Sequence, residues 1–330
     1  MLGAIIIAGF AEEVSEDALA LSSSVRSNPD GANTCFAATQ VLGCSTIVRT
    51  VEYLRRSGVD EVSVFGNRRG ASRGSDDTQA PYPDEQAWKN AATQLRRYQE
   101  DGCEAVLVTR TGAYIECDLA RLLEQHHEYG EPITRTFDKE GALDLWIVDP
   151  NRLDDSGELL ATLRAAQTAD CEVGGYVNRL LGAGDLRRLA ADILSSRCRV
   201  RPHAAEMRPG VWMEEGAQVE RGARVVAPAY IGRGVTIADE CLITRGSNVE
   251  SNSLIDFGTV IEDSSILPDT YVGIGLDLSH SVVDGSEVLN LQHGVRLRIT
   301  DPVVVRRNAP HRNSQNGVEL SEVILSARGQ

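Results

Sequence analysis

The sequence has no excess of basic residues, since 48 acidic side chains outnumber 33 basic ones and the formal net charge is −15. Long-range repulsion by this charge opposes general binding to nucleic acid or to anionic lipid, so we expect neither as a partner. No apolar run is long enough to cross a membrane. The short apolar run at residues 2–9 lacks a basic leader, which favours a first buried strand over a signal peptide.

Cysteine pairs that would indicate a disulfide framework or a zinc site are also missing. The seven cysteines are scattered, odd in number and form no C-x-x-C pair: Cys35, Cys44, Cys103, Cys117, Cys171, Cys198 and Cys241. This pattern favours isolated thiols in a reducing cytoplasm. The chain is long enough for two domains, each with a core of its own.

The second half of the sequence contains a repeat of six residues. Every sixth residue is aliphatic: Val219, Val225, Ile231, Ile237, Ile243, Val249, Ile255, Ile261 and Leu267. A second series is small or β-branched: Ala217, Ala223, Ala229, Val235, Cys241, Ser247, Ser253, Thr259 and Ser265. A third place in the same frame holds glycine: Gly210, Gly216, Gly222, Gly234, Gly246 and Gly258.

Each series has a structural reason. In a triangular coil with three short strands per turn, one inward-pointing residue recurs every six positions and stacks on its equivalents. The corner between two strands takes small side chains, and its backbone often needs the positive φ that glycine adopts easily. Stacked coils bury an aliphatic column that no single repeat could bury. The pattern predicts a parallel β-helix over residues 201–295, with a one-residue shift near Pro268 and a polar tail at 296–330.

The first half, residues 1–200, has the pattern of an α/β domain. A buried strand at 4–8, a helix at 45–56 closed by Gly58 and a strand at 59–65 together predict a βαβ unit. Further helices are expected at 84–100, 118–129 and 186–194, and further strands at 104–109 and 143–148. Residues 67–83 indicate a surface loop, and 138–141 a turn between strands.

Two stretches carry a resemblance to a known family. The first is Val41-Leu42-Gly43-Cys44-Ser45-Thr46-Ile47 running into Gly58-Val59-Asp60-Glu61-Val62, and the second is Val225-Val226-Ala227-Pro228-Ala229-Tyr230-Ile231-Gly232 with residues 277–285 behind it. They resemble sugar nucleotidyltransferases, especially mannose-1-phosphate guanylyltransferase-like proteins. The resemblance implies a Rossmann-like α/β nucleotidyltransferase domain followed by a left-handed parallel β-helix of hexapeptide repeats.

The catalytic groups of that family are not found at the matching positions. Its chemistry uses a glycine-rich phosphate loop, a lysine on the sugar phosphate and two aspartates on Mg²⁺, each of which offsets developing negative charge. After the first strand the family has G-x-G-T-R, whereas this chain has Ala8-Gly9-Phe10-Ala11-Glu12-Glu13-Val14, which is acidic. Phe36 is nearest the lysine position, and the places of the two aspartates read Thr109-Arg110-Thr111-Gly112-Ala113 and Asn178-Arg179.

We therefore expect a nucleotidyltransferase-like protein with impaired catalysis and a regulatory, ligand-sensing or assembly role in nucleotide-sugar metabolism. Its expected ligand is a nucleotide or sugar phosphate, and its partner a second copy or a paralogue. No bound metal or cofactor is expected, apart from Mg²⁺ if nucleotidyl transfer is retained. The remnant of the nucleotide site comprises Ala8, Gly9, Phe10, Arg26, Arg110 and Gly112.

Two alternatives stay open. The chain could be an active nucleotidyltransferase that makes an NDP-sugar, with Arg26, Arg110 or Arg179 in place of the lysine and metal; otherwise these arginines are surface charges. It could also be a hexapeptide acyltransferase that uses His280, which is otherwise a structural or surface histidine. The run His126-His127-Glu128 is interpreted as a solvated helix end, because adjacent helical side chains point about 100° apart.

Overall fold

The computed structural model describes residues 1–8, 39–66, 85–110, 112–153, 158–165 and 169–308, which form two compact units. Within these ranges, the first unit comprises 1–8 and 47–179, and the second comprises 39–46 and 180–308. The division differs from the boundary at residue 200 that the sequence suggested. Helix α6 (Ala183–Leu194) belongs to the second unit, because it packs against strand β24 (Ser281–Asp284) of the coil.

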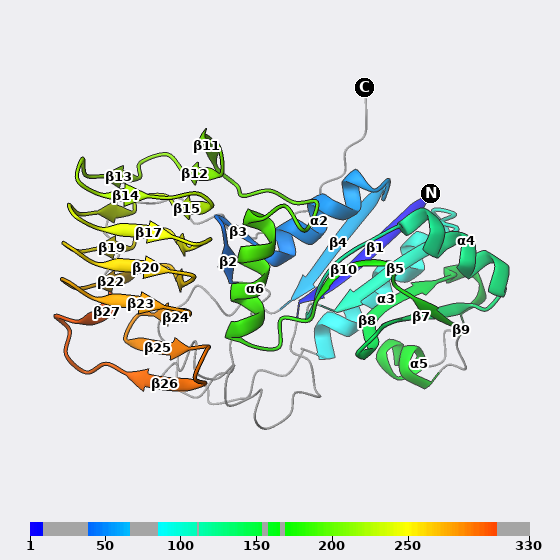
Figure 1. The fold of residues 1–330 in the computed structure, drawn as a ribbon. Helices are drawn as coiled ribbons and strands as arrows, with labels where there is room; N and C mark the ends of the chain where they lie inside the picture. The colour runs from blue at the N-terminus through cyan, green and yellow to red at the C-terminus, as the bar shows by residue number, and fades with distance from the viewer. Residues whose placement is uncertain (9–38, 67–84, 111, 154–157, 166–168, 309–330) are drawn as a thin grey trace. The chain divides into compact units, whose positions relative to one another are not determined.

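The first unit is built on a mixed six-stranded sheet in the order β4-β1-β5-β8-β7-β9 (Figure 1). β1 pairs in parallel with β4 and β5, while β8 runs antiparallel to β5 and β7. A separate ribbon pairs β6 with β10. The strands are β1 (Leu2–Ala8), β4 (Glu61–Gly66), β5 (Ala105–Arg110), β6 (Tyr114–Cys117), β7 (Ile133–Asp138), β8 (Gly141–Val148), β9 (Ala169–Glu172) and β10 (Gly175–Asn178).

Helices cover both faces of this sheet. Side chains of α2 (Thr46–Arg56) and α4 (Leu119–Tyr129) pack with Ile6 in one core. Side chains of α3 (Glu85–Glu100) and α5 (Leu159–Ala165) pack with Ile5 and Ile7 in the other, and a short 3-10 helix, η2 (Pro150–Arg152), follows β8. The central strand is apolar throughout because its side chains are buried on both faces. The predicted βαβ unit is confirmed as β1, α2 and β4.

Helix α4 shows how local sequence sets an element's ends. Asp118 caps its first turn by accepting the N–H of Arg121, and Gly130 ends it with a φ of 65°. The expectation that this helix ends in solvated histidines is wrong for His126. Its ring is buried and its Nδ1 lies 2.7 Å from Thr134 Oγ1. Burial, and then the neighbouring His127, lowers the pKa of His126.

The second unit is a stack of short strands in three sheets, consistent with a parallel β-helix (Figure 1). One sheet has the order β11-β12-β15-β18-β21-β24-β25-β26, the second β13-β16-β19-β22-β27 and the third β14-β17-β20-β23. The strands are β11 (Ala205–Arg208), β12 (Val211–Met213), β13 (Gln218–Val219), β14 (Arg224–Val225), β15 (Ala229–Ile231), β16 (Thr236–Ile237), β17 (Leu242–Thr244), β18 (Asn248–Val249), β19 (Leu254–Ile255), β20 (Val260–Glu262), β21 (Ser265–Ile266), β22 (Thr270–Val272), β23 (Asp277–Ser279), β24, β25 (Glu287–Asn290), β26 (Val295–Arg298) and β27 (Val305–Arg307).

The strand register confirms the aliphatic column. Val211 pairs with Ala229, 18 positions further along, which is three periods of six. The spacing drops to 17 where Asn248 pairs with Ser265, so the expected one-residue shift near Pro268 is also present. The inward aliphatic residues are fully buried from the second coil onward: Ile231, Ile237, Ile243, Val249, Ile255 and Ile261.

The small residues of the second series form a hydrogen-bonded ladder. Ser247, Ser253 and Thr259 each donate a hydroxyl to the carbonyl oxygen 14 positions later, at 3.3, 3.1 and 2.6 Å. Each hydroxyl also accepts the backbone N–H 17 positions later. After the register shift, this place is taken by Ser264, which corrects the assignment of Ser265. The buried hydroxyls are therefore satisfied by the backbone of the next coil.

The expectation of a tail from residue 296 is wrong for its described part. Strand β26 extends one sheet by pairing with β25, and β27 runs antiparallel to β22 in another. Arg306 stacks over the ring of Tyr271, 3.8 Å from its centre. The six-residue pattern ends before β26 and β27, because both strands pair antiparallel with their neighbours and do not add another parallel turn to the coil. Residues 309–330 lie outside the described part of the chain.

The cysteines that the structure describes are all free thiols. Cys35 lies outside the described residues. Among the helices that are described, none is both long enough and apolar enough to cross a membrane.

Residues 40–45, at the start of the first stretch that resembles sugar nucleotidyltransferases, form a hairpin that belongs to the second unit. Strands β2 (Gln40–Val41) and β3 (Cys44–Ser45) pair antiparallel across a two-residue turn, where Leu42 and Gly43 have φ values of 52° and 81°. Two positive φ values are the requirement of the tightest hairpin turns. The carboxylate of Glu250, on the coil, accepts the N–H groups of Leu42 at 2.7 Å and Gly43 at 3.2 Å.

Candidate functional site

The connections of the sheet identify an edge where ligands bind in α/β proteins. From β1 the chain passes through α2 to β4 on one side, and then through α3 to β5 on the other side of β1. The two crossover helices cover opposite faces. In α/β sheets, one strand can be followed by a connection to its left and its neighbour by a connection to its right. A crevice then forms at the carboxyl ends of these two strands, and ligands bind in it. That place is the end of β1 and β5.

Arg110 is the last residue of β5 and stands at this edge. It pairs with Ile7 of β1 and is 3% exposed, so the interpretation of this arginine as a surface charge is wrong. Its Nε lies 2.9 Å from Oδ2 of Asp144, on the antiparallel neighbour β8. The two groups attract each other as an ion pair, but they are not aligned as a hydrogen bond. Nε and Nη1 of Arg110 therefore have no hydrogen-bond acceptor among the described residues.

Two indole N–H groups on the same side of the sheet also lack acceptors. Trp88 on α3 and Trp146 on β8 belong to the core that contains Ile7, and their Nε1 atoms are buried without a partner among the described residues. Trp146 and Asp144 are two residues apart on one strand and so face the same way. An unsatisfied buried donor costs about 1–3 kcal/mol. The two indoles are enclosed in the apolar core, whereas Arg110 stands at the end of its strand, so Arg110 is the unsatisfied donor that is placed for an anion.

The other expected site residues are placed as follows. Ala8 ends β1, where it pairs with Gly66 of β4, so the structure brings Ala8 and Arg110 to one edge. Gly112 follows β5 after one residue. Gly9, Phe10, Arg26 and Phe36 lie outside the described residues.

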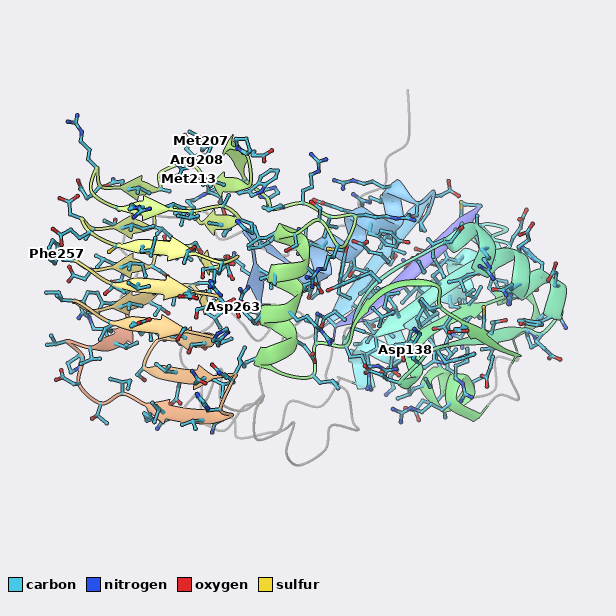
Figure 2. All side chains as sticks on the ribbon, viewed as in Figure 1. Asp138, Met207, Arg208, Met213, Phe257 and Asp263 are labelled. Atoms are coloured by element: carbon cyan, nitrogen blue, oxygen red, sulfur yellow. The ribbon has the colours of Figure 1, made fainter. Side chains whose placement is uncertain are left out.

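Arg179 is engaged elsewhere. Its guanidinium binds the carboxylates of Asp138 and Glu140 and the carbonyl oxygens of Gly141 and Ala142, so it holds the turn between β7 and β8. The pKa of Asp138 (Figure 2) is lowered, because the hydrogen bonds from Arg179 and from backbone N–H groups outweigh burial, which alone would raise it. This confirms the predicted turn and gives Arg179 a structural role.

No cluster of metal-ligating side chains occurs among the residues that the structure describes. In the stretch 109–113, where the first aspartate was expected, Thr109 donates its hydroxyl to the carbonyl oxygen of Asp144 at 3.1 Å. At the place of the second, Asn178 is fully buried and its Nδ2 lies 3.4 Å from the hydroxyl of Tyr176. Neither position presents a carboxylate.

Sequence reasoning missed Asp144, Trp88 and Trp146. A signal for Asp144 was present, because a single carboxylate interrupts the apolar strand 143–148. The two tryptophans carry no such signal, since an indole in an apolar pattern indicates only core.

A second group of polar residues lies in the second unit. His280 Nδ1 is 2.5 Å from Oδ2 of Asp263, which is labelled in Figure 2, and both side chains are 39% exposed. The other oxygen of Asp263 accepts Nη2 of Arg187 at 2.6 Å. Arg187 extends from α6 and is 4% exposed; burial lowers its pKa and Asp263 opposes that shift. One carboxylate thus holds both a buried arginine and a half-exposed imidazole.

The comparisons with known proteins identify no family. The sequence matches no protein-family model, and no curated protein matches it.

Proposed function

We propose that the first unit binds a phosphate-bearing ligand, a nucleotide or a sugar phosphate, and that the chain is a nucleotidyltransferase-like protein with impaired transfer chemistry. Its first unit would be of the Rossmann-like type, and its coil a left-handed β-helix. The role is regulatory, ligand-sensing or one of assembly in nucleotide-sugar metabolism. A cytoplasmic location is proposed with it, supported by the free thiols of the described cysteines.

The observation that carries the proposal is the environment of Arg110. A guanidinium presents its donors in a planar fork that matches two phosphate oxygens. Here the Nε and Nη1 donors are buried without hydrogen-bond acceptors among the described residues, and the ion pair with Asp144 reaches only Nε. A phosphate at the end of β5 would satisfy donors that otherwise cost free energy.

The support for impaired transfer comes from the charges that are absent at the matching positions. Phosphoryl and nucleotidyl transfer need cations around the reacting phosphates. The resemblance places the metal-binding aspartates in the stretches 109–113 and 178–179, and neither stretch contains a carboxylate that would hold Mg²⁺. A single arginine supports binding of one phosphate group better than it supports transfer between two.

Isothermal titration of the full chain with nucleoside triphosphates, sugar 1-phosphates and NDP-sugars tests the binding. We expect Arg110→Met to weaken binding about 10- to 100-fold, because a hydrogen bond to a charged group contributes about 1.5–3 kcal/mol. Arg135→Met is the matched control. Arg135 lies on β7 of the same sheet but pairs at the surface with Asp170. The Arg135→Met variant should therefore bind the phosphate compounds as tightly as the native chain does.

Two results would contradict the proposal. If none of the phosphate compounds binds, or if Arg110→Met and Arg135→Met bind equally well, the site is not a phosphate site. Release of pyrophosphate with Mg²⁺ at an ordinary enzymatic rate, about 1–1,000 s⁻¹, would instead favour the active nucleotidyltransferase.

A second candidate, acyl transfer at the coil, is favoured by one observation. Asp263 holds Nδ1 of His280, which leaves Nε2 as the nitrogen for a reacting hydroxyl or amine. This function predicts that acyl-CoA binds and that His280→Asn abolishes transfer to an acceptor while the fold is retained. A flat titration of the native protein with acyl-CoA would dismiss it. The contact of Asp263 with buried Arg187 provides the competing, structural reason for the pair.

A further inference from the structure

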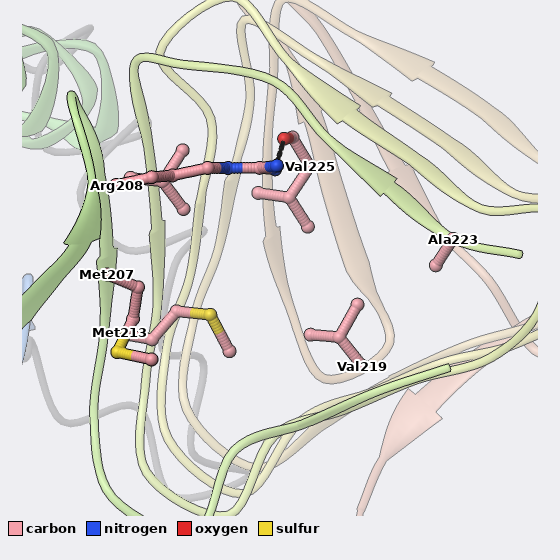
Figure 3. A pocket seen from close by; sticks show the side chains of 7 residues that line it. Met207, Arg208, Met213, Val219, Ala223 and Val225 are labelled. Atoms are coloured by element: carbon pink, nitrogen blue, oxygen red, sulfur yellow. Dashed lines mark hydrogen bonds between the residues drawn. The ribbon is translucent and has the colours of Figure 1, made fainter. Parts of the chain in front are cut away.

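The coil of the second unit has an open apolar end. A cavity of about 290 Å³ opens at its first coil (Figure 3), and its walls include Met207, Met213, Val219 and Val225. The guanidinium of Arg208 lies across it and donates to the carbonyl oxygen of Val225. Figure 2 places Met207, Arg208 and Met213 together at this end.

The end is open because two of the three sheets stop there. β13 and β14 are the outermost strands of their sheets, and only β11 continues the third sheet past the first coil. At the opposite end, β25, β26 and β27 add antiparallel strands beyond or beside the last coil. The aliphatic column is therefore covered at one end and reachable at the other. The coils of a β-helix normally need such a cover at both ends.

Strand β11 itself is an exposed edge. All four of its residues are exposed, and β12 is its one neighbour among the described strands. The pairing with β12 shifts between Glu206 and Arg208, so Met207 is out of register with the ladder. Met207 is 67% exposed. An exposed edge beside an apolar opening is a candidate surface for association with another chain.

We propose that the occupant of this surface is the same surface of a second copy, related by a two-fold axis near Met207. In such an interface each contact occurs twice, with residue and partner exchanged. Glu206 and Arg208 flank Met207, one on each side, and they have opposite charges. Within one chain, Arg208 uses one guanidinium nitrogen on Val225 and Glu206 uses one carboxylate oxygen on Gly210. Around an axis at Met207, the remaining donors of Arg208 in each copy face the remaining oxygen of Glu206 in the other. The surface is thus complementary to itself in charge, and the two methionines cover the two apolar openings.

Self-complementarity is what favours a second copy over other occupants. A small apolar ligand would fill the cavity without using the opposite charges of Glu206 and Arg208. The net charge of −15 per chain opposes association of two copies, but charges further apart than about 8 Å are screened at physiological ionic strength. The contacts at the axis are not screened in this way, because they become buried.

Light scattering coupled to size exclusion, with sedimentation equilibrium for the dissociation constant, tests the apolar part of the interface. The native full chain is expected to dimerise, and Met207→Glu to weaken the dimer by about tenfold or more, as expected for a residue at the centre of an interface. Phe257→Glu is the matched control. Phe257 is also a large exposed apolar residue of the coil, but it lies away from this end (Figure 2). The Phe257→Glu variant should therefore form a dimer as tight as that of the native chain.

A charge exchange tests the two-fold pairing. Glu206→Arg alone and Arg208→Glu alone each place like charges opposite one another twice, so each variant should be monomeric. An equimolar mixture of these two variants should form heterodimers, because every facing pair is then of opposite charge. The double variant, Glu206→Arg with Arg208→Glu, should dimerise by itself. Both residues also have contacts within their own chain, Glu206 with the N–H of Gly210 and Arg208 with the carbonyl oxygen of Val225. Rescue by mixing therefore separates a lost interface from a folding defect.

The proposal is overturned by any of three results. The native chain could be monomeric at all concentrations measured. Met207→Glu and Phe257→Glu could leave the dimer equally tight, which would place an interface elsewhere. The mixture of the two charge variants could remain monomeric while hydrogen exchange shows both variants folded.

Discussion

Gly175→Ala should destabilise the first unit by about 3 kcal/mol or more, one of the largest effects of any single change in this chain. Gly175 begins β10 with a φ of 142°, a backbone conformation that residues with a side chain rarely adopt. A Cβ atom there would also overlap the carbonyl oxygen of Glu116 on the paired strand β6. Backbone atoms of a paired strand cannot move aside without breaking the ribbon.

The neighbouring Gly174 provides the matched control. A Cβ atom at Gly174 would have nothing within 4 Å, so Gly174→Ala should change stability by no more than about 0.5 kcal/mol. Hydrogen exchange of β6 and β10, followed by mass spectrometry, measures both variants in the full chain. Equal protection of the ribbon in the two variants would show that Gly175 is not restricted in the way described.

Glu250→Ala should release the hairpin at residues 40–45 from the coil, with a loss of about 3 kcal/mol or more. The carboxylate is fully buried and accepts the N–H groups of Leu42 and Gly43, together with Nδ2 of Asn248 at 2.8 Å. Removal of the carboxylate leaves these buried donors without their charged acceptor. Faster hydrogen exchange of the Leu42 and Gly43 amides is the expected measurement.

Glu262→Ala is the control for this change. Glu262 lies on β20 of the same coil and pairs with the exposed Arg245, so its loss should cost no more than about 1 kcal/mol. The amides of Leu42 and Gly43 should exchange at the native rate in that variant. If the hairpin stayed equally protected in Glu250→Ala, the carboxylate would not be what holds it.

Local patterns predicted those parts of the fold whose causes are local. The cap at Asp118 and the end at Gly130 define α4, because each acts within one helical turn. The strand 4–8 and the helix after it predicted the βαβ unit for the same reason. In the coil, Ile243 stacks on equivalents 18 residues away, and the six-residue period repeats that relation in every turn.

The candidate site could be predicted only in part. Arg110 was named because it stands where the resemblance places a catalytic group, and the structure brings it beside Ala8 at one sheet edge. Its burial and its pairing with Asp144 could not be predicted, because they depend on the antiparallel placement of β8 next to β5. His126 was misjudged for a similar reason: its partner Thr134 lies on β7, and helix spacing says nothing of that strand.

By itself, the amino-acid sequence determined the repeat of the coil and the α/β character of the first half, since each depends on residue type and spacing along the chain. Tertiary structure alone decided which donors are buried without acceptors among the described residues, and that residues 39–46 and α6 group with the coil. It also decided that residues 295–298 and 305–307 pair as strands of the second unit. The physical reason is the distance along the chain. A hydrogen bond between Leu42 and Glu250 joins residues 208 positions apart, and no period or cap relates them.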